Sequence, residues 1–281
     1  MTRRVIVTAD DFGLSEAVNE AVERAHREGI LTAASLMVAG LAAEDAVRRA
    51  RRLPSLAVGL HLVLVQGPAV LPPACLPGLV DASGRFPSDQ FRLGLAYFFK
   101  PAARRQLADE IRAQFEAFAA TGLRLDHVNA HKHMHLHPTV GRLVIAIGRE
   151  FGLRAVRVPA EPPSVLSRCG KRPGTAARAL LGWSRLLRNQ VRRAGLASND
   201  QCFGIAWTGH MSAERLLRLI PELPPGLSEI YSHPAAGSDP ALTALMPDYE
   251  PEAEFAALLD PRVHAALDGN GVRLAAGYAD A

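Results

Sequence analysis

Short runs of apolar and β-branched residues alternate with longer amphipathic stretches along most of the chain. The first run, residues 4–9, precedes a stretch with apolar residues at helical spacing, residues 14–29, in which Ser15 is a candidate N-cap and Gly29 a candidate C-cap. The other predicted strands are residues 31–38, 56–64, 124–131, 154–159, 202–207, 227–234 and 272–279. The other predicted helices are residues 43–53, 104–120, 139–152 and a segment after Met211. About eight such alternations predict an α/β fold with a mainly parallel sheet covered by helices.

The length of the chain suits a closed arrangement of these elements. It has 281 residues, and a (β/α) barrel needs about 250. We therefore predict a distorted (β/α) TIM-like barrel, with a doubly wound open sheet as the alternative. A loop rich in proline and glycine spans residues 67–87, but neither an internal repeat nor a linker divides the sequence. Residues 1–281 are accordingly predicted to form a single domain.

The composition excludes several classes of protein. Apolar residues make up 48% and charged residues 21% of the chain, as is usual for a globular protein with a full core. The three cysteines are widely spaced, which argues against a disulfide framework or a thiolate metal site. The first apolar run is too short for a signal peptide, and no run of about 18 apolar residues is present. We therefore expect a cytoplasmic protein.

Polar residues interrupt the predicted strands near their ends. They are Asp10, Asp11, His61, His131 and His233. An Asp pair is often only a turn or cap, and a single histidine among leucines is often a hydrogen-bonded core residue. In a (β/α) barrel, however, the active site forms at the C-terminal ends of the strands. Four strand ends that each carry such a residue favour an active site over four separate structural roles.

Four histidines occupy alternate positions just before Pro138. They are His131, His133, His135 and His137. In an extended strand, residues two apart lie on one face and about 6.6–7 Å apart, so all four could not reach one ion without sharp curvature. We predict that one of them binds metal and that a neighbour contacts substrate or moves a proton. The others would line the turn before Pro138, which suits the first turn of a helix.

A site made of one carboxylate and two imidazoles would leave coordination positions open, as catalytic metal sites do. Zinc fits such donors best, and Mg, Mn, Fe, Co or Ni could occupy the same set. Such an ion lowers the pKa of bound water to about 7 and polarises a carbonyl oxygen. The second aspartate of the pair is then available as a base. The chemistry favoured by these residues is hydrolysis.

Five stretches, TADDFGLS, GILTAASLMV, VGLHLVL, HVNAHKHMHLHP and YSHP, together resemble the motifs of the YdjC-like (ChbG-like) carbohydrate deacetylases, in the same order and across most of the chain. The resemblance implies a distorted (β/α) barrel and metal-dependent removal of an N-acetyl group from an amino sugar. By position it implies that Asp11, His61 and His131 are metal ligands. It also implies that Asp10 is the general base and His233 the acid that protonates the leaving amine.

Other residues are candidates for supporting roles. His133 or His135 could replace His233 as the acid or could bind substrate. Arg157, in the VRVP stretch at another strand end, could orient Asp10 or bind the sugar.

A finer resemblance concerns the substrate. The stretches RRLPSLAVGLHLVLVQGPAVLPPACLPGLVDASGRF, NAHKHMHLHPTVGRL and LRAVRVPAEPP resemble the hopanoid-biosynthesis-associated (HpnK) branch. That branch implies N-acetylglucosaminyl bacteriohopanetetrol, a membrane lipid, as substrate. The alternatives are a chitooligosaccharide deacetylase, a metal-dependent phosphoesterase or amidohydrolase-type barrel, and a non-enzymatic sugar or lipid binder. Phosphoesterase-type barrels usually carry their first His-x-His near the start of the chain, whereas here the ladder is central.

A basic amphipathic segment covers residues 168–196, with a helix predicted from about Thr175. Its basic residues are Arg168, Lys171, Arg172, Arg178, Arg185, Arg188, Arg192 and Arg193, and no acidic residue lies between them. Such a helix can lie on an anionic bilayer at the inner membrane surface. The alternatives are a barrel helix with a solvated basic face or a nucleic-acid patch, and the latter is disfavoured because little else on the chain is basic and aromatic together. The sequence is also compatible with a homo-oligomer.

Overall fold

The structure, a computed structural model, describes residues 2–172 and 174–280, with all of their side chains except those of residues 175–178, 241 and 280. Its strands are β1 (Arg3–Phe12), β2 (Ala33–Leu36), β3 (Ala57–Leu62), β4 (Val128–Ala130), β5 (Gln201–Phe203), β6 (Gly226–Ser232) and β7 (Val272–Leu274). Its α-helices are α1 (Glu16–Glu28), α2 (Ala43–Ala50), α3 (Gln90–Phe99), α4 (Pro101–Ala120), α5 (Pro138–Glu150), α6 (Pro163–Arg168), α7 (Thr175–Arg193), α8 (Ala213–Leu219), α9 (Pro240–Leu245), α10 (Pro251–Leu259) and α11 (Pro261–Gly269). Its 3-10 helices are η1 (Pro73–Cys75), η2 (His131–Leu136), η3 (Ile220–Glu222) and η4 (Tyr278–Asp280).

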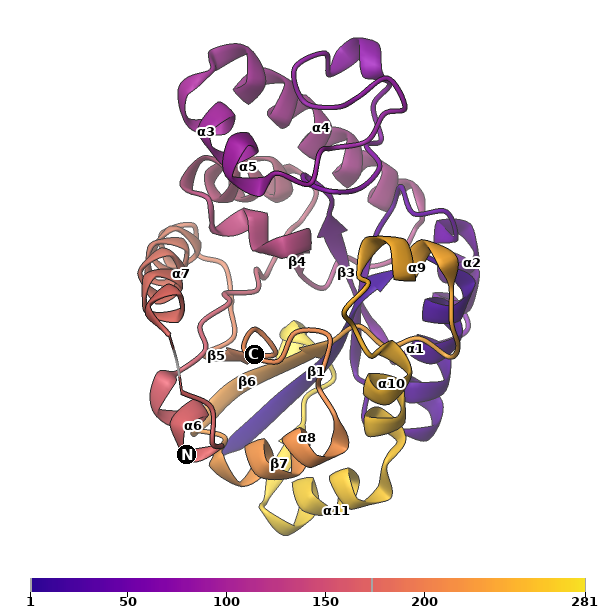
Figure 1. Ribbon diagram of the computed structural model, residues 1–281, viewed down its shortest axis with the longest axis vertical. Coiled ribbons are helices and arrows are strands. Elements are labelled where there is room, and N and C mark those ends of the chain that lie inside the picture. The colour runs from indigo at the N-terminus through magenta and orange to yellow at the C-terminus, as the bar shows by residue number, and fades with distance from the viewer. Residues whose placement is uncertain (1, 173, 281) are drawn as a thin grey trace.

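The strands form a parallel sheet that curls into an incomplete barrel (Figure 1). The order is β4-β3-β2-β1-β6-β5, and β7 pairs with the first residues of β1. Beyond β4 the curve continues through isolated bridges from Val128 to Val156 and from Ala155 to Ala197. The segment around residue 155 thus leads the sheet from β4 toward β5. This arrangement confirms the predicted distorted (β/α) barrel.

Side-chain alternation along β1 separates two parts of the core. Val5 packs in the main core between the sheet and the helices, whereas Ile6 lies in a small cluster that includes Tyr278. Successive side chains of a strand point to opposite faces, so Thr8 and Asp10 point the same way as Ile6. β1 therefore carries polar groups into the barrel, toward the C-terminal ends of the strands.

Helix ends follow the signals in the sequence. α1 begins after Ser15, whose hydroxyl oxygen accepts a hydrogen bond from the Val18 amide, and it is capped at its end by Gly29. Both predicted caps are confirmed. α5 begins at Pro138. Proline suits the first position of a helix because a backbone N–H there would have no hydrogen-bond partner within the helix. α7 begins at Thr175, as predicted for the basic segment.

Most predicted strands are shorter than expected; β4, for example, covers only Val128–Ala130 of the predicted residues 124–131. Residues 154–159 form only isolated bridges, because the ladder stops before Pro159, which has no N–H to donate. The strand predicted at 202–207 becomes β5, which stops where Gly204 adopts a φ of +133°. Of residues 272–279, only the first three form a strand, β7.

Helices α3 and α4 lie at one end of the molecule, at the top of Figure 1, together with the predicted loop of residues 67–87. The hydroxyl of Tyr97 in α3 donates a hydrogen bond to the Leu64 carbonyl, 3.0 Å away. The buried Glu110 of α4 accepts a hydrogen bond from the Val70 amide at 2.8 Å. These contacts fasten both helices and the loop to the segment that follows β3. No helix in the described ranges is both long and apolar enough to cross a bilayer.

Candidate metal centre and active site

The end of β1 turns two consecutive aspartates toward the mouth of the barrel. The β1–β2 register shifts between Ala9 and Phe12, and Asp11 has a left-handed backbone with a φ of 60°. A regular strand would send Asp10 and Asp11 to opposite faces, but a bulge can redirect a side chain next to an active site. Both carboxylates are buried. A non-glycine residue in this conformation costs of order 1–3 kcal/mol, and such strain is concentrated at functional sites.

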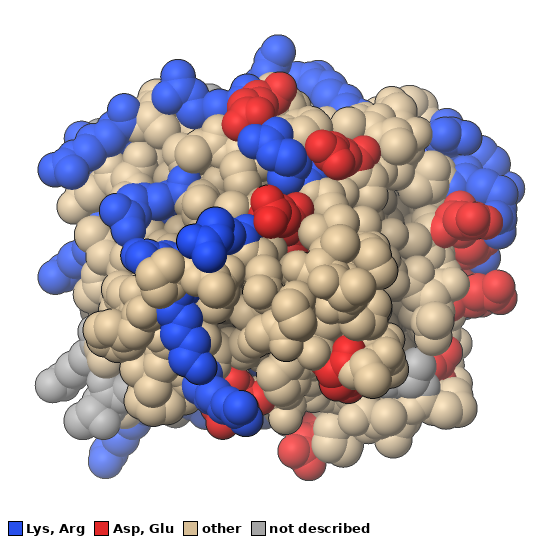
Figure 2. Space-filling model, turned by 90° about the horizontal axis from the view of Figure 1, so that it is seen from above, with Lys and Arg blue, Asp and Glu red and all other residues tan. Residues whose placement is uncertain are grey.

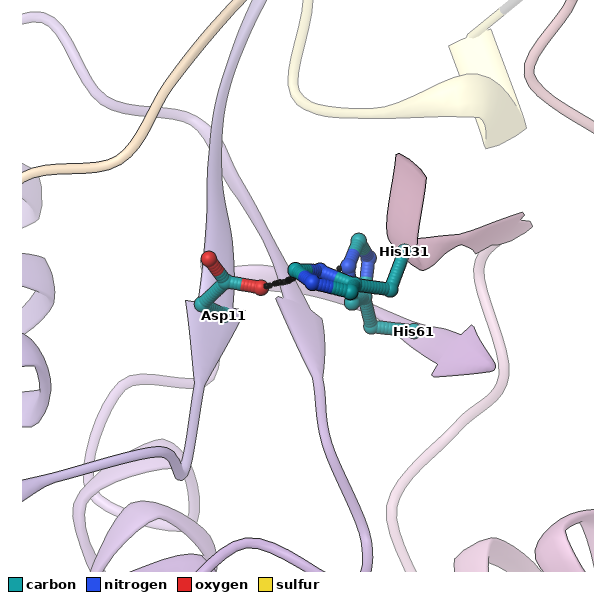
Figure 3. A group of neighbouring side chains, drawn as sticks. All are labelled: Asp11, His61 and His131. Carbon is teal, nitrogen blue, oxygen red and sulfur yellow. Dashed lines mark ion pairs between the residues drawn. The ribbon is translucent and has the colours of Figure 1, made fainter. Parts of the chain in front are cut away.

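Asp11, His61 and His131 converge at this end of the barrel (Figure 3). His61 Nε2 lies 3.3 Å and His131 Nδ1 lies 3.4 Å from Asp11 Oδ1. One donor atom from each residue lies within 4.8 Å of the others. Among the described residues, neither carboxylate oxygen of Asp11 nor the Nε2 atom of either histidine has a hydrogen-bond partner. Because buried polar atoms are normally paired, this donor set fits a divalent cation.

The orientation of His61 is fixed by Asn129, at the centre of β4. The Asn129 amide group donates hydrogen bonds to Asp10 Oδ1 at 3.0 Å and to Ser35 Oγ at 2.9 Å. Its carbonyl oxygen therefore faces His61 Nδ1, 2.7 Å away, so Nδ1 must be the donor. The lone pair of His61 then lies on Nε2, which faces Asp11. A partner of this kind behind a ligating histidine fixes its tautomer and ring orientation.

Arg157 forms a bidentate ion pair with Asp10 inside the barrel. Its NH1 lies 2.6 Å from Asp10 Oδ2 and its NH2 lies 3.0 Å from Asp10 Oδ1, while NH2 is also 2.8 Å from Glu229 Oε1. Burial alone would raise the pKa of Asp10, but the Arg157 charge holds that pKa well below its usual range. The guanidinium is fully buried and stacks over the Tyr231 ring at 4.7 Å. Of the two predicted roles for Arg157, the geometry favours the orientation of Asp10.

His233 follows β6 and is held by Glu254 of α10. The Glu254 carboxylate accepts a hydrogen bond from the His233 backbone amide at 2.6 Å, and its Oε2 lies 3.7 Å from the His233 Nδ1. Burial alone would lower the pKa of His233, but Glu254, with the charges of Asp11 and Asp10, raises it to about 9. Without a bound cation, these carboxylates therefore favour the protonated imidazole, the form that a general acid requires.

The histidine ladder does not continue as an extended strand. The chain folds into η2 at His131, and the next two residues, Lys132 and His133, have left-handed backbones with φ of 50° and 55°. The imidazoles therefore point to different surroundings. His133 Nε2 lies 3.0 Å from the Tyr231 hydroxyl, and His135 Nε2 lies 3.1 Å from the Arg157 carbonyl. Of the four, His131 is the one in the metal-ligating group, which agrees with a ladder that supplies one ligand.

A cavity of about 320 Å³ opens beside these groups, at the lower end of the range of about 300–1,000 Å³ for small-molecule sites. Its polar lining includes Asp10, His61, His131, His133, Tyr231 and His233. Residues 245–249 form another part of its wall, and the Tyr249 ring lies 5.0 Å from that of His233. The cavity thus offers space for a small polar molecule within reach of the candidate ligands.

The structure brings the predicted ligands, base and acid together but separates the predicted substrate-binding residues. His133 lines the cavity, whereas His135 and Arg157 are fully buried behind it. Their role in substrate binding stays a prediction.

Three residues that hold site residues in place were not predicted from the sequence: Asn129, Glu229 and Glu254. The first two are buried polar residues inside strands, where burial is costly without a partner. That cost is the signal that could have identified them. Glu254 gave no comparable signal, because charged residues are ordinary in a helix such as α10.

Known proteins resemble this chain along much of its length. A carbohydrate deacetylase from Geobacillus stearothermophilus is 31% identical over 275 residues, which are 98% of this chain and 96% of that protein. A carbohydrate deacetylase from Brevibacillus brevis is 40% identical over 160 residues. That second match spans 57% of this chain and 59% of the relative, so it covers only part of each protein.

One solved structure shares the fold, and one family profile matches most of the chain. A candidate cellobiose-phosphate cleavage protein from Enterococcus faecalis V583 shares the fold, with a TM-score of 0.79 and 24% identity over 99% of this chain and 98% of that one. The profile of the family described as YdjC-like protein matches residues 4–269. Together with the nearly full-length relative from Geobacillus, this match shows that the chain belongs to the YdjC-like protein family.

Proposed function

We propose that this protein is a metal-dependent hydrolase that removes the acetyl group from an N-acetylated amino sugar. The observation that carries the proposal is the group of Asp11, His61 and His131 beside the Asp10 cavity, whose buried ligand atoms Asp11 Oδ1, Asp11 Oδ2, His61 Nε2 and His131 Nε2 have no hydrogen-bond partner in the part of the chain that the structure describes. The relatives named carbohydrate deacetylases support the same reaction.

Asp11, His61 and His131 would hold the ion. One carboxylate and two imidazoles suit zinc best, although Mg, Mn, Fe, Co and Ni accept the same donors. When bound, such an ion polarises the amide carbonyl and lowers the pKa of water from 15.7 to about 7.

Asp10 is placed to act as the general base. Its carboxylate stays ionised at physiological pH, and Arg157 and Asn129 fix its orientation. As the oxygen of the attacking water bonds to the carbonyl carbon, a proton of that water passes to Asp10. His233 donates its proton to the nitrogen as the C–N bond breaks, so the products are acetate and a free amine.

Replacing His233 with glutamine should lower kcat by about 10²–10⁴, the usual contribution of a general acid. Metal affinity should not change, because His233 is outside the metal-ligating group. In the wild type, kcat should fall at alkaline pH as His233 loses its proton. The midpoint of this fall should lie at or below a pH of about 9, because a bound cation that neutralises Asp11 would remove one of the charges that raise the pKa of His233. A pH–rate profile checks this, and an alkaline limb that survives in H233Q would contradict the role.

Replacing Asn129 with leucine should weaken zinc binding by about 10–100-fold, the usual effect of losing a partner behind a ligating histidine. His61 would lose the acceptor at Nδ1 that selects its tautomer. Ser35→Ala is a matched control, since Ser35 contacts the same amide but not His61. Competition titrations with a chromogenic chelator measure both affinities. Equal affinity in N129L and wild type would show that Asn129 does not position the ligand.

The finer proposal concerns the acetylated molecule. The resemblance of three long stretches to the hopanoid branch supports N-acetylglucosaminyl bacteriohopanetetrol as substrate. Acetate release from this lipid, from chitooligosaccharides and from p-nitrophenyl phosphate separates the candidate reactions. Release from the lipid at the highest kcat/KM is the expected result. Preference for chitooligosaccharides would reject the lipid, and turnover of the phosphate ester alone would reject the deacetylase.

We also propose reversible contact of α7 with an anionic bilayer. Its Leu187 and Val191 are buried in the core, while Arg185, Arg192 and Trp183 are exposed; the Arg178 side chain lies outside the described residues. Figure 2, a view onto the end with α3 and α4, shows Lys and Arg side chains along its left, top and right edges, and α7 lies on the left in Figure 1. Each basic side chain near such a surface contributes about 1 kcal/mol. Cosedimentation with phosphatidylserine vesicles but not phosphatidylcholine vesicles is expected, and equal cosedimentation would contradict it.

A further inference from the structure

Helix α3 is a surface helix with apolar side chains on both faces. It buries Leu93 and Tyr97 against the core, yet Phe91 is 78% exposed and Phe99 is 76% exposed. A helix that is apolar all round is normally buried, and clustered exposed apolar side chains mark binding surfaces. The outer face of α3 is therefore a candidate binding surface.

This face of α3 and one end of α7 enclose a groove of about 570 Å³, which we call the α3–α7 groove. Phe91, Leu95 and Phe98 line it from α3, and Leu180 and Trp183 line it from α7. No aspartate or glutamate is among its described lining residues. Its walls are mainly apolar, so they suit an apolar ligand better than a sugar chain, whose hydroxyls need partners. The polar side chains of its described lining are those of Gln90, Lys132, His133 and His137.

The groove adjoins the active-site cavity. Lys132 and His133 line both spaces. Gln90 Nε2, at the start of α3, donates a hydrogen bond to the Lys132 carbonyl at 2.9 Å, and His133 Nε2 lies 3.0 Å from the Tyr231 hydroxyl in the cavity. The η2 turn is thus the boundary between a polar cavity and an apolar groove. One molecule with a polar head and an apolar remainder can occupy both.

We propose that the α3–α7 groove binds the apolar aglycone of the amino-sugar substrate, a hydrocarbon group joined to the sugar. The inference rests on the proposed deacetylase function, which places the acetamido sugar in the cavity beside Asp10. The bond from sugar to aglycone would then pass His133, and the aglycone would lie between Phe98 and Trp183.

Two substrates with the same sugar test this directly: methyl and octyl N-acetyl-β-glucosaminide, both supplied as monomers below the micelle concentration to the zinc-loaded enzyme. Burial of each methylene contributes roughly a three- to fourfold gain in kcat/KM. If about half of the octyl chain is buried, the octyl glycoside should be preferred by at least about thirtyfold.

Variants locate the preference in the groove. Phe91→Ser and Trp183→Ser should each reduce kcat/KM for the octyl glycoside by about tenfold, the effect of losing part of this apolar contact. Neither should change the value for the methyl glycoside. Leu274→Ser is a matched control, because Leu274 is also partly exposed but lies on β7, beside the start of β1. It should change neither value.

The outcomes separate the groove from the reaction. Equal kcat/KM for the two glycosides would overturn the groove assignment while the deacetylase function stands. If neither glycoside is hydrolysed, the proposed deacetylase function is wrong, and a binding measurement then tests the groove. Octyl but not methyl glycoside should change the fluorescence of the exposed Trp183, and Trp183→Phe should abolish the change. Groove variants that alter self-association or vesicle binding, but leave the octyl preference intact, would assign the groove to a second copy or a bilayer and overturn the proposal.

Discussion

Asparagine in place of Asp11 should abolish acetate release, with kcat/KM lowered by at least about a thousandfold, because metal assistance supplies several kcal/mol of transition-state stabilisation. Asp11 is the only carboxylate of the metal-ligating group found among the described residues. Asparagine keeps the shape of the side chain but removes the charge that attracts a cation. Acetate release by the zinc-supplemented variant measures the loss.

Thermal unfolding shows whether the loss is one of metal binding. Zinc that binds the folded state should raise the Tm of the wild type and leave the Tm of D11N unchanged. Asp109→Asn, which alters an exposed carboxylate on α4, should behave like the wild type in both assays. Full activity of D11N, or of the wild type after exhaustive chelation, would contradict the metal-dependent reaction.

Methionine in place of Arg157 should lower the free energy of unfolding by about 3–5 kcal/mol, because it leaves buried charges without a partner. Arg157 is fully buried and neutralises both Asp10 and Glu229. The variant should also lose most of its activity, since Asp10 would no longer be held in place or held ionised. Urea unfolding at pH 7 measures the change, and a loss below about 1 kcal/mol would contradict the role.

A second substitution and a change of pH keep this prediction testable if R157M folds poorly. Adding Glu229→Gln should restore part of the stability, because one of the two orphaned charges is removed. Asp10 has a folded pKa below its unfolded value of about 3.9. Its pairing with Arg157 therefore stabilises the fold above that pH and loses this contribution as the pH falls through the folded value. The deficit of R157M should be full at pH 7 and shrink at the acid end.

The residues that form the site could be predicted because the fold brings strand ends together. The alternation of strands and helices indicated a parallel barrel, and in such a barrel all C-terminal strand ends meet at one mouth. Asp11, His61 and His131 are remote in sequence but occupy such ends, on β1, β3 and the turn after β4. Hydrophobic patterning was therefore enough to place the strand-end residues near one another, whereas the choice of these three as metal ligands came from the resemblance to the deacetylase family.

The local backbone at the site could not be predicted in the same way. A period-two pattern does not reveal a bulge, so the left-handed Asp11 and the register shift in β1 were not foreseen. Alternate histidines looked extended, whereas η2 folds them back through two left-handed residues. Asn129 and Glu229 were missed because the role of a buried polar residue in a strand depends on a partner that is remote in the sequence.

The convergence of Asp11, His61 and His131 on one cation is best tested by anomalous diffraction at the zinc edge from crystals of the zinc-loaded protein. A single strong peak at the mouth of the barrel is expected, with a carboxylate oxygen and two imidazole nitrogens at about 2.0–2.2 Å from it. Crystals in which zinc binds elsewhere, or in which these three side chains point away from a common centre, would contradict the account.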